Sequence, residues 1–249
     1  MCGIIAAAST RNVGKLLVQG LHKMEYRGYD SAGIALHQES SIAHLRTVGK
    51  VQLLEDKMIA EKPKSKLGIA HTRWATHGEP SEVNAHPHKS KDSVYIVHNG
   101  IIENYVELRE SLTNDGYEFT SQTDSELIAH MLNDFISQDN SMIDAMYLAK
   151  EKLEGAYAIA AIDLNNNSNL VVARNKSPLL LGLGTDEMFA ASDPLAIAQL
   201  TNDFIFLEDG DVASISAEEY KIYDALKKEV SRDVTHIDIS SQATSKGDF

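Results

Sequence analysis

The sequence contains a single cysteine, few aromatic residues and no long hydrophobic run. Cys2 is the only thiol among 249 residues, so no disulfide can form within the chain and a cytoplasmic location is expected. No apolar run approaches about 18 residues, and no basic stretch followed by a hydrophobic one opens the chain. We therefore expect a globular protein with neither a membrane partner nor a signal peptide.

Positive charge is also scarce. The chain carries 23 Lys and Arg residues against 36 Asp and Glu residues, for a net charge of −13. A surplus of negative charge repels phosphate backbones, so nucleic acid is not an expected partner. The 43% hydrophobic content is enough for one large core or two small ones.

The spacing of apolar residues predicts a strand and then a helix near the N-terminus. After the apolar run CGIIAAAS, Asn12 is a plausible helix cap. Apolar residues recur at helical spacing from Val13 to Met24, and Gly28 would end this helix. Short apolar runs between polar loops follow, so we expect strands to dominate residues 31–102.

Helical patterns return in the middle of the chain. Thr123 and Glu126 have capping-box spacing ahead of one apolar stripe, while Ser141 would cap a second helix that ends near Gly155. Apolar runs separated by NNNSN and EDGD turn signals predict strands again over 156–216. Strands, two helices and further strands predict an α+β fold with two sheets and helices layered outside them.

The last part of the sequence differs from the rest. HIDISSQATSKGDF, residues 236–249, is polar and rich in serine, without apolar periodicity. Such composition is typical of a tail or linker. We therefore predict one domain over residues 1–235, followed by the beginning of a linker at 236–249.

The segment HTRWATHG, residues 71–78, concentrates polar and aromatic side chains where a predicted strand ends. His86, His88 and His98 follow nearby, which raises the possibility of a zinc site. The sequence has no His-x-x-x-His helix, no second cysteine and no paired carboxylates at recognised spacing, so we expect no metal. Most of the histidines are expected to be structural.

The pair Asn99–Gly100 in HNGIIENY allows two interpretations. Asn-Gly is a strong hairpin-turn signal, and this segment alone favours a turn. An Asn amide beside a glycine N–H can also provide two donors for a developing oxyanion. Taken individually, the carboxylate of Asp124 can be explained by a favourable interaction with a helix dipole, and the charge of Arg73 by an ion pair at the surface.

Cys2 itself has three possible roles. It could be a small buried residue at the start of a strand, a metal ligand, or a nucleophile activated by its surroundings. No single motif decides between them.

Five motifs together resemble one family. In order, MCGI, EYRGYDSAGIA, HTRWATHG, HNGIIENY and SQTDSE are similar to the glutaminase domain of glutamine:fructose-6-phosphate aminotransferases, which are class II, N-terminal-nucleophile amidotransferases. The resemblance covers essentially the whole chain. It implies a four-layer αββα sandwich of the N-terminal-nucleophile hydrolase type, hydrolysis of L-glutamine to glutamate and ammonia, and no cofactor.

The resemblance also implies roles for individual residues. Met1 would be removed, so that Cys2 carries both the nucleophilic thiol and a free α-amine, with ordinary pKa values of about 8.5 and about 7.7 to 8.0. The other implied residues are the oxyanion donors Asn99 and Gly100, Arg73 and Asp124 for the carboxylate and ammonium of glutamine, Thr76 and His77 lining the pocket, Trp74 on a closing loop, and Arg27 near the amine.

Members of the family continue into an isomerase half, which uses the ammonia to convert fructose 6-phosphate into glucosamine 6-phosphate. No such half follows Phe249 here. The expected partners are therefore L-glutamine and an isomerase domain that this chain lacks. Three alternatives remain open: the glutaminase domain of another class II amidotransferase, a non-catalytic glutamine-binding module, and a metal-binding protein.

Overall fold

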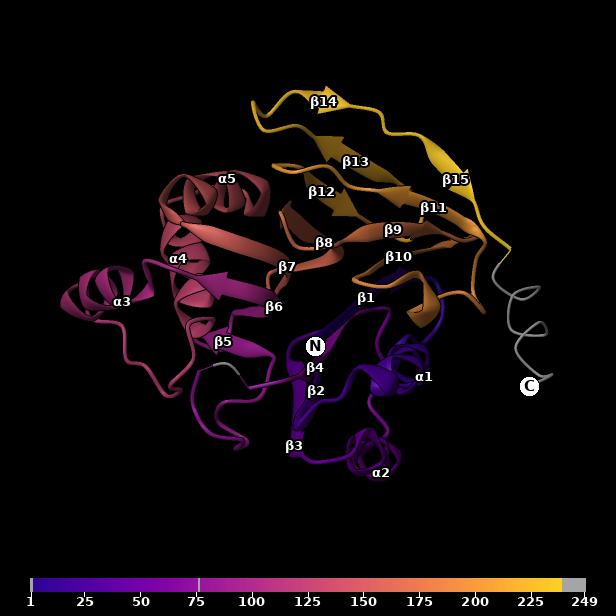
Figure 1. Cartoon of the computed structure of the whole chain (residues 1–249), viewed down its shortest axis with the longest axis horizontal. Helices are drawn as coiled ribbons and strands as arrows, with labels where there is room; N and C mark the ends of the chain where they lie inside the picture. The colour runs from indigo at the N-terminus through magenta and orange to yellow at the C-terminus, as the bar shows by residue number, and fades with distance from the viewer. Residues whose placement is uncertain (1, 76, 239–249) are drawn as a thin grey trace.

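A computed structural model describes residues 2–75 and 77–238. Two antiparallel sheets form its centre (Figure 1). The eight-stranded sheet contains, in spatial order, β15 (Val234–His236), β11 (Asp203–Phe206), β9 (Leu180–Leu183), β10 (Glu187–Ala191), β1 (Gly3–Ser9), β4 (Leu67–Arg73), β2 (Ser31–His37) and β3 (Ile42–Val48). The seven-stranded sheet contains β14 (Glu229–Val230), β13 (Tyr220–Tyr223), β12 (Val212–Ile215), β8 (Asn166–Asn175), β7 (Gly155–Asp163), β6 (Val94–Ile102) and β5 (His88–Ser90).

Helices cover the outer face of each sheet. They are α1 (Gly14–Met24), α2 (Val51–Glu61), α3 (Tyr105–Asn114), α4 (Glu126–Ser137) and α5 (Met142–Lys152), with short 3₁₀ turns η1 (Glu25–Arg27) and η2 (Pro194–Ala196). Figure 1 shows α1 and α2 gathered on one side of the sheets and α3, α4 and α5 on the other. Among the described residues, no helix is both long and apolar enough to cross a membrane.

Three apolar clusters hold these layers together. One lies between α1, α2 and the eight-stranded sheet, and another between the seven-stranded sheet and α3, α4 and α5. The third lies between the two sheets and takes residues from both, such as Ile4 and Val97. Burial of these faces provides the main stabilisation of the sandwich, and the predicted αββα arrangement is confirmed.

The helix predictions were partly right. Ser141 caps α5, since its Oγ accepts a hydrogen bond from the Asp144 N–H at 3.1 Å. The capping box was wrong: α4 begins at Glu126, whose carboxylate instead accepts N–H bonds from Thr120 and Ser121 in the preceding loop. Asp124 therefore precedes the helix rather than opening it.

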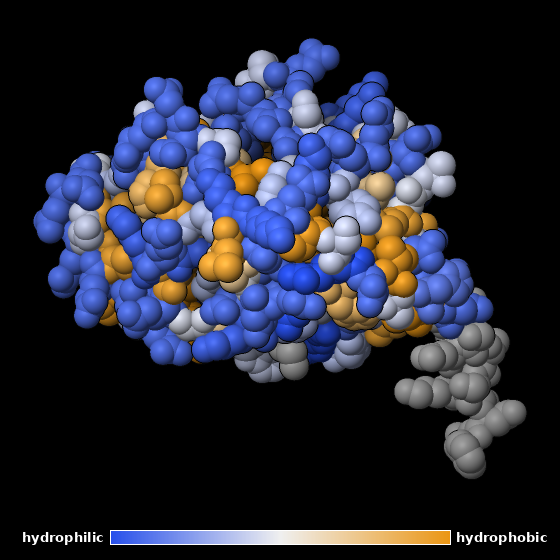
Figure 2. All heavy atoms as spheres, turned by 90° about the horizontal axis from the view of Figure 1, so that it is seen from above, coloured by the Kyte–Doolittle hydropathy of each residue, from blue (hydrophilic) through white to orange (hydrophobic). Residues whose placement is uncertain are grey.

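A helix was missed within residues 31–102, which we had assigned mainly to strands. Helix α2 buries only Val51 and Leu54 completely, while Leu53 and Ile59 are 49% and 60% exposed. An apolar residue on the solvent side obscures the period by which an amphipathic helix is recognised. Exposed apolar residues of this kind are scattered over the molecule, and Figure 2 shows small hydrophobic patches between hydrophilic residues on one face.

The C-terminal part adds an edge strand. β15 pairs with β11, with His236 opposite Asp203. Residues 239–249, most of the predicted linker, lie outside the described residues. The domain boundary at residue 235 stays a prediction.

Candidate active site

The candidate site lies where the apolar core between the sheets ends. Side chains alternate along a strand, so the inner face of β4 runs from Leu67 and Ile69 to Arg73, and that of β6 runs from Val97 to Asn99. By the same alternation, Cys2 continues the inner face of β1. At the same end of the sandwich, the inner faces of β1, β4 and β6 therefore change from apolar to polar residues.

The thiol of Cys2 is partly buried against the backbone of Trp74. The Trp74 N–H donates to Sγ at 3.2 Å, and Sγ lies 3.5 Å from the Trp74 carbonyl oxygen. Burial raises the pKa of the Cys2 thiol, and the Trp74 N–H opposes that rise. The thiol is therefore protonated near neutral pH and needs a base to become a nucleophile.

Asn99 and Gly100 do not form a turn, so that interpretation was wrong. Both lie within β6, opposite Ala158 and Tyr157 of β7. Gly100 has φ of +137°, and a Cβ there would lie 1.9 Å from the Ala156 carbonyl oxygen. The glycine is needed for close strand approach, while the Asn99 side chain points its Nδ2 toward the Cys2 carbonyl at 3.3 Å.

The charged side chains of the site are buried and held by backbone groups. Arg73 donates to the carbonyl of His77, to that of Gly78 at 3.1 Å and to that of Glu79 at 3.4 Å. Asp124 Oδ2 accepts from the Ile102 N–H at 2.8 Å. Arg73 therefore stabilises the position of the loop that follows β4 through these hydrogen bonds.

A small cavity joins these groups. Its volume is ≈ 20 Å³, about the space of one water molecule. The lining residues are Cys2, Arg73, Trp74, His77, His86, His98, Gly100, Thr123, Asp124 and Ser125. The structure thus brings together most of the residues implied by the resemblance, whereas Thr76 lies outside the described residues.

Arg27 is placed differently. Its guanidinium forms an ion pair with Asp193, to which the Tyr26 hydroxyl also donates at 2.5 Å. Arg27 is not among the described residues that line the cavity. Arg27 can therefore influence the site only indirectly, through the residues that it contacts.

Other residues of the site were missed by the sequence analysis. Asp30 accepts from the Ala75 N–H and lies 3.8 Å from the Arg73 guanidinium, so it supports the same loop. Thr123 was interpreted as a helix cap, and Ser125 was not considered. Asp30 stands inside EYRGYDSAGIA, but no spacing rule connects residue 30 with residue 75.

Buried histidines pack against one another beside the cavity, and His86 is one of its lining residues. The ring of His86 lies 4.1 Å from that of His71 and 4.5 Å from that of His88, between ring centroids. Burial lowers the pKa of His71 to about 3, and those of His86 and His88 well below the usual range. These rings are neutral, and the described residues contain no group of three or more His, Cys, Asp or Glu side chains that could hold a metal ion.

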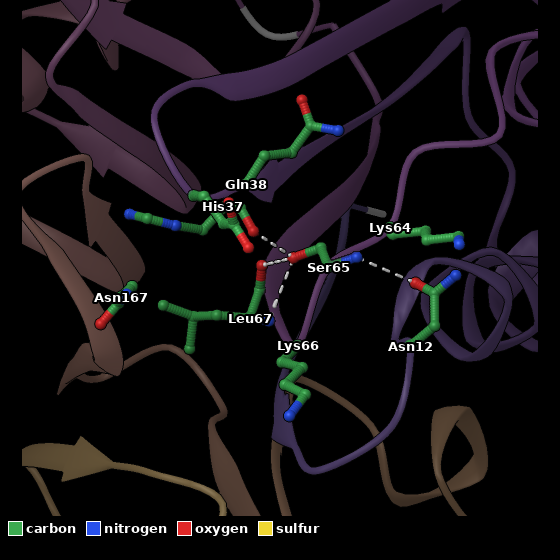
Figure 3. Close-up of a pocket in the computed structure, with 9 residues that line it drawn as sticks. Asn12, His37, Gln38, Lys64, Ser65, Lys66, Leu67 and Asn167 are labelled. Atoms are coloured by element: carbon green, nitrogen blue, oxygen red, sulfur yellow. Dashed lines mark hydrogen bonds between the residues drawn. The ribbon is translucent and has the colours of Figure 1, made fainter.

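A larger hollow of ≈ 440 Å³ lies at the other end of β4, where Ser65 and Leu67 line it. Its inner polar groups bond to each other (Figure 3): Ser65 Oγ lies 2.7 Å from the His37 carbonyl oxygen, and the Ser65 N–H donates to Asn12 Oδ1 at 3.2 Å. The thiol, guanidinium and carboxylate converge on the smaller cavity, which is therefore the candidate site.

The chain is similar to known glutamine amidotransferases. A family model described as a glutamine amidotransferase domain matches residues 71–199. The chain is 47% identical over 250 residues to glutamine–fructose-6-phosphate aminotransferase (isomerizing) of Vibrio vulnificus (strain YJ016), and 47% over 251 residues to the protein of that name from Haemophilus influenzae. Each alignment covers all of this chain and 41% of the relative.

Solved structures show the same fold. Glutamine phosphoribosylpyrophosphate amidotransferase from B. subtilis, complexed with ADP and GMP, superposes with a TM-score of 0.78 at 24% identity, over 90% of this chain and 49% of that one. The fold is thus of the N-terminal-nucleophile hydrolase type. Since the family model spans more than half of the sequence and the alignments run its whole length, the chain belongs to the class II glutamine amidotransferase domain family.

Proposed function

We propose that the chain hydrolyses L-glutamine to L-glutamate and ammonia, with Cys2 as the nucleophile. The observation that carries the proposal is the position of the only thiol. It lies beside the Trp74 N–H, in the residue whose backbone carbonyl accepts from Asn99 Nδ2, at the end of the inner sheet face. Removal of Met1 would free the α-amine of Cys2. An amine with a pKa of about 7.7 to 8.0 can take the thiol proton near neutral pH.

The proposed steps balance within this site. Sulfur attacks the side-chain amide carbon while the thiol proton passes to the α-amine, and the oxyanion accepts from Asn99 Nδ2 and the Gly100 N–H. The C–N bond then breaks, and the leaving nitrogen takes the proton and departs as ammonia. Water adds to the γ-glutamyl thioester while one of its protons passes to the α-amine. The C–S bond then breaks, the leaving sulfur takes that proton back to restore the thiol, and glutamate leaves.

Arg73 and Asp124 are proposed to bind the carboxylate and the ammonium of glutamine. Both side chains now have backbone partners, and the ≈ 20 Å³ cavity has no room for an amino acid. The loop after β4 must therefore move when glutamine enters. Arg73 would exchange loop carbonyls for the substrate carboxylate, a charge-assisted contact that is stronger than the bonds it replaces.

Conservative variants test these two contacts. Arg73→Lys and Asp124→Asn should each raise KM for glutamine. Arg73→Lys keeps the positive charge but loses the planar, two-pronged donor that matches a carboxylate. Asp124→Asn removes the charge that would pair with the substrate ammonium, and removing one partner of a buried charge pair costs about 2 to 5 kcal/mol. Arg232→Lys and Asp211→Asn, at a partly buried ion pair that does not line the cavity, are the matched controls. An unchanged KM in Arg73→Lys or Asp124→Asn would leave that residue with a structural role only.

We further propose that the domain belongs to a longer, cytoplasmic protein and supplies ammonia to fructose 6-phosphate there. The acceptor is suggested by the names of the relatives, which are glutamine–fructose-6-phosphate aminotransferases. The chain spans 41% of their length, so the acceptor site is assigned to the isomerase part of that protein. The alternative of another class II acceptor would be tested with that longer protein.

The chain as it stands should release free ammonia and glutamate in equal amounts. Fructose 6-phosphate should neither be aminated nor change the rate, because a ligand without a site cannot shift the loop. Ammonia, glutamate and glucosamine 6-phosphate would be quantified together, with the intact mass reporting loss of Met1. Formation of glucosamine 6-phosphate would show that the acceptor site lies within these 249 residues. Processed protein without turnover would instead indicate a glutamine-binding module.

A further inference from the structure

One buried histidine is bonded directly to the proposed oxyanion donor. His71 of β4 and Asn99 of β6 belong to different sheets, and His71 Nε2 lies 2.9 Å from Asn99 Oδ1. The two residues are 0% and 8% exposed. This bond therefore crosses the sandwich beside Cys2, shielded from water.

The direction of the bond follows from the atoms. An amide oxygen can only accept, so Nε2 of His71 carries the proton and donates it to Oδ1. With Oδ1 held toward β4, the Nδ2 group points to the other side, where it lies 3.3 Å from the Cys2 carbonyl oxygen. An amide rotated by 180° would place its oxygen against that carbonyl, and this contact would be repulsive whichever nitrogen of His71 carries the proton.

The surroundings fix the state of the ring. Burial keeps His71 neutral at working pH, and its Nδ1 has no hydrogen-bond partner among the described residues. A single proton on Nε2 satisfies the bond to Asn99. The His86 ring, 4.1 Å away between centroids, packs against the imidazole and restrains its plane.

We propose that His71 is a positioning residue, which orients the Asn99 amide so that its NH₂ group faces the oxyanion. This inference rests on the proposed role of Asn99 in the hydrolysis of glutamine. His71 touches neither the substrate nor the reacting atoms, and it acts only through Asn99. Its effect belongs to the transition state, since the ground-state carbonyl needs the donor less than the oxyanion does.

Two polar replacements separate positioning from packing. The amide nitrogen of glutamine can reach the place of Nε2, whereas that of asparagine stops near the place of Nδ1. His71→Asn should lower kcat by about 10- to 100-fold, part of the 100- to 1000-fold cost of losing an oxyanion donor, and should change KM by less than about threefold. His71→Gln should retain kcat within about fivefold of the unmodified chain.

A matched control lies at the other end of the sandwich. His37 of β2 is also buried, and it also bonds across the sandwich, since its Nε2 lies 2.8 Å from the carbonyl oxygen of Leu164 in the turn between β7 and β8. His37→Asn removes an inter-sheet bond far from Cys2, so it should lower the melting temperature and leave kcat unchanged. If His37→Asn lowered kcat as much as His71→Asn does, the effect would be one of stability and the inference would be wrong.

A double-mutant cycle tests whether His71 acts through Asn99. Asn99→Ala should lower kcat by about 100-fold or more, and adding His71→Asn to it should cost less than a further twofold. An additional loss as large as that in the unmodified chain would overturn the positioning role. An Asn99→Ala variant with full kcat would overturn the proposed oxyanion role itself, so the two failures are distinguishable.

Discussion

Replacing Cys2 with alanine should reduce glutamine hydrolysis to the background rate. The sequence has no other thiol that could substitute for it. Removal of a catalytic nucleophile typically lowers kcat by about 10⁶-fold, and an effect of that order is expected here. Release of ammonia and glutamate, together with the mass shift produced by an electrophilic glutamine analogue, would measure the loss.

The same assay tests the base. Protein that retains Met1 has an amide nitrogen on Cys2, which cannot accept a proton near neutral pH, so it should be nearly inactive although folded. Cys2→Ser is the matched variant for Cys2→Ala, because serine keeps the approximate size of the side chain and can keep the contact with the Trp74 N–H. Appreciable turnover by Cys2→Ala would remove the thiol from the mechanism, and full activity with Met1 attached would assign the base to another group.

Acid should unfold the domain steeply, as a result of the buried histidines. His71, His86 and His88 are neutral in the fold because burial lowers their pKa values, whereas in the unfolded chain their pKa is about 6.5. Below that pH the unfolded state binds more protons, so the free energy of unfolding falls as pH decreases. Each histidine contributes about 1.4 kcal/mol per pH unit to the slope of the free energy of unfolding against pH, and the three together contribute about 4 kcal/mol per pH unit.

The slope of stability against pH measures this effect. Urea unfolding at pH 7.5, 6.0 and 5.0 should show little change from these groups above pH 7 and a steep loss below pH 6. His86→Phe should reduce the slope by about 1.4 kcal/mol per pH unit. Phe204→Leu, a change to a buried residue without a titrating group, should lower stability at every pH but keep the slope. Equal stability at pH 7.5 and 5.0 would mean that the rings are hydrated and can charge within the fold.

Sequence patterns predicted the layers of this fold better than the details of its site. The stripe of α1 and the apolar runs of β1, β4 and β6 face continuous cores, so their periods are clear. Helix α2 lies at the surface with Leu53 exposed, and its period was lost among neighbouring strands. Local propensity also favoured a turn at Asn99–Gly100, but pairing with β7 prevailed over it.

The candidate site residues were proposed from motif order rather than from spacing. Arg73, Asp124 and the missed Asp30 are far apart in the sequence, and only sheet pairing and loop packing bring them to one place. The bond from His71 to Asn99 also joins different sheets, and no periodicity in a single segment can reveal it. Contacts between layers are tertiary information, which a local pattern does not contain.

The position of β1 explains how a residue so near the chain end can be held in place. β1 is flanked on one side by β4 and on the other by β10, with Gly3 opposite Thr72 and Ile5 opposite Ala191. Fraying of this end would require two hydrogen-bonded ladders to separate at once, at a cost well above that of opening an ordinary terminus. Cys2 directly precedes this strand, which is paired on both sides. The thiol is therefore already held in place, and binding of the substrate does not incur the entropy loss of ordering a flexible tail.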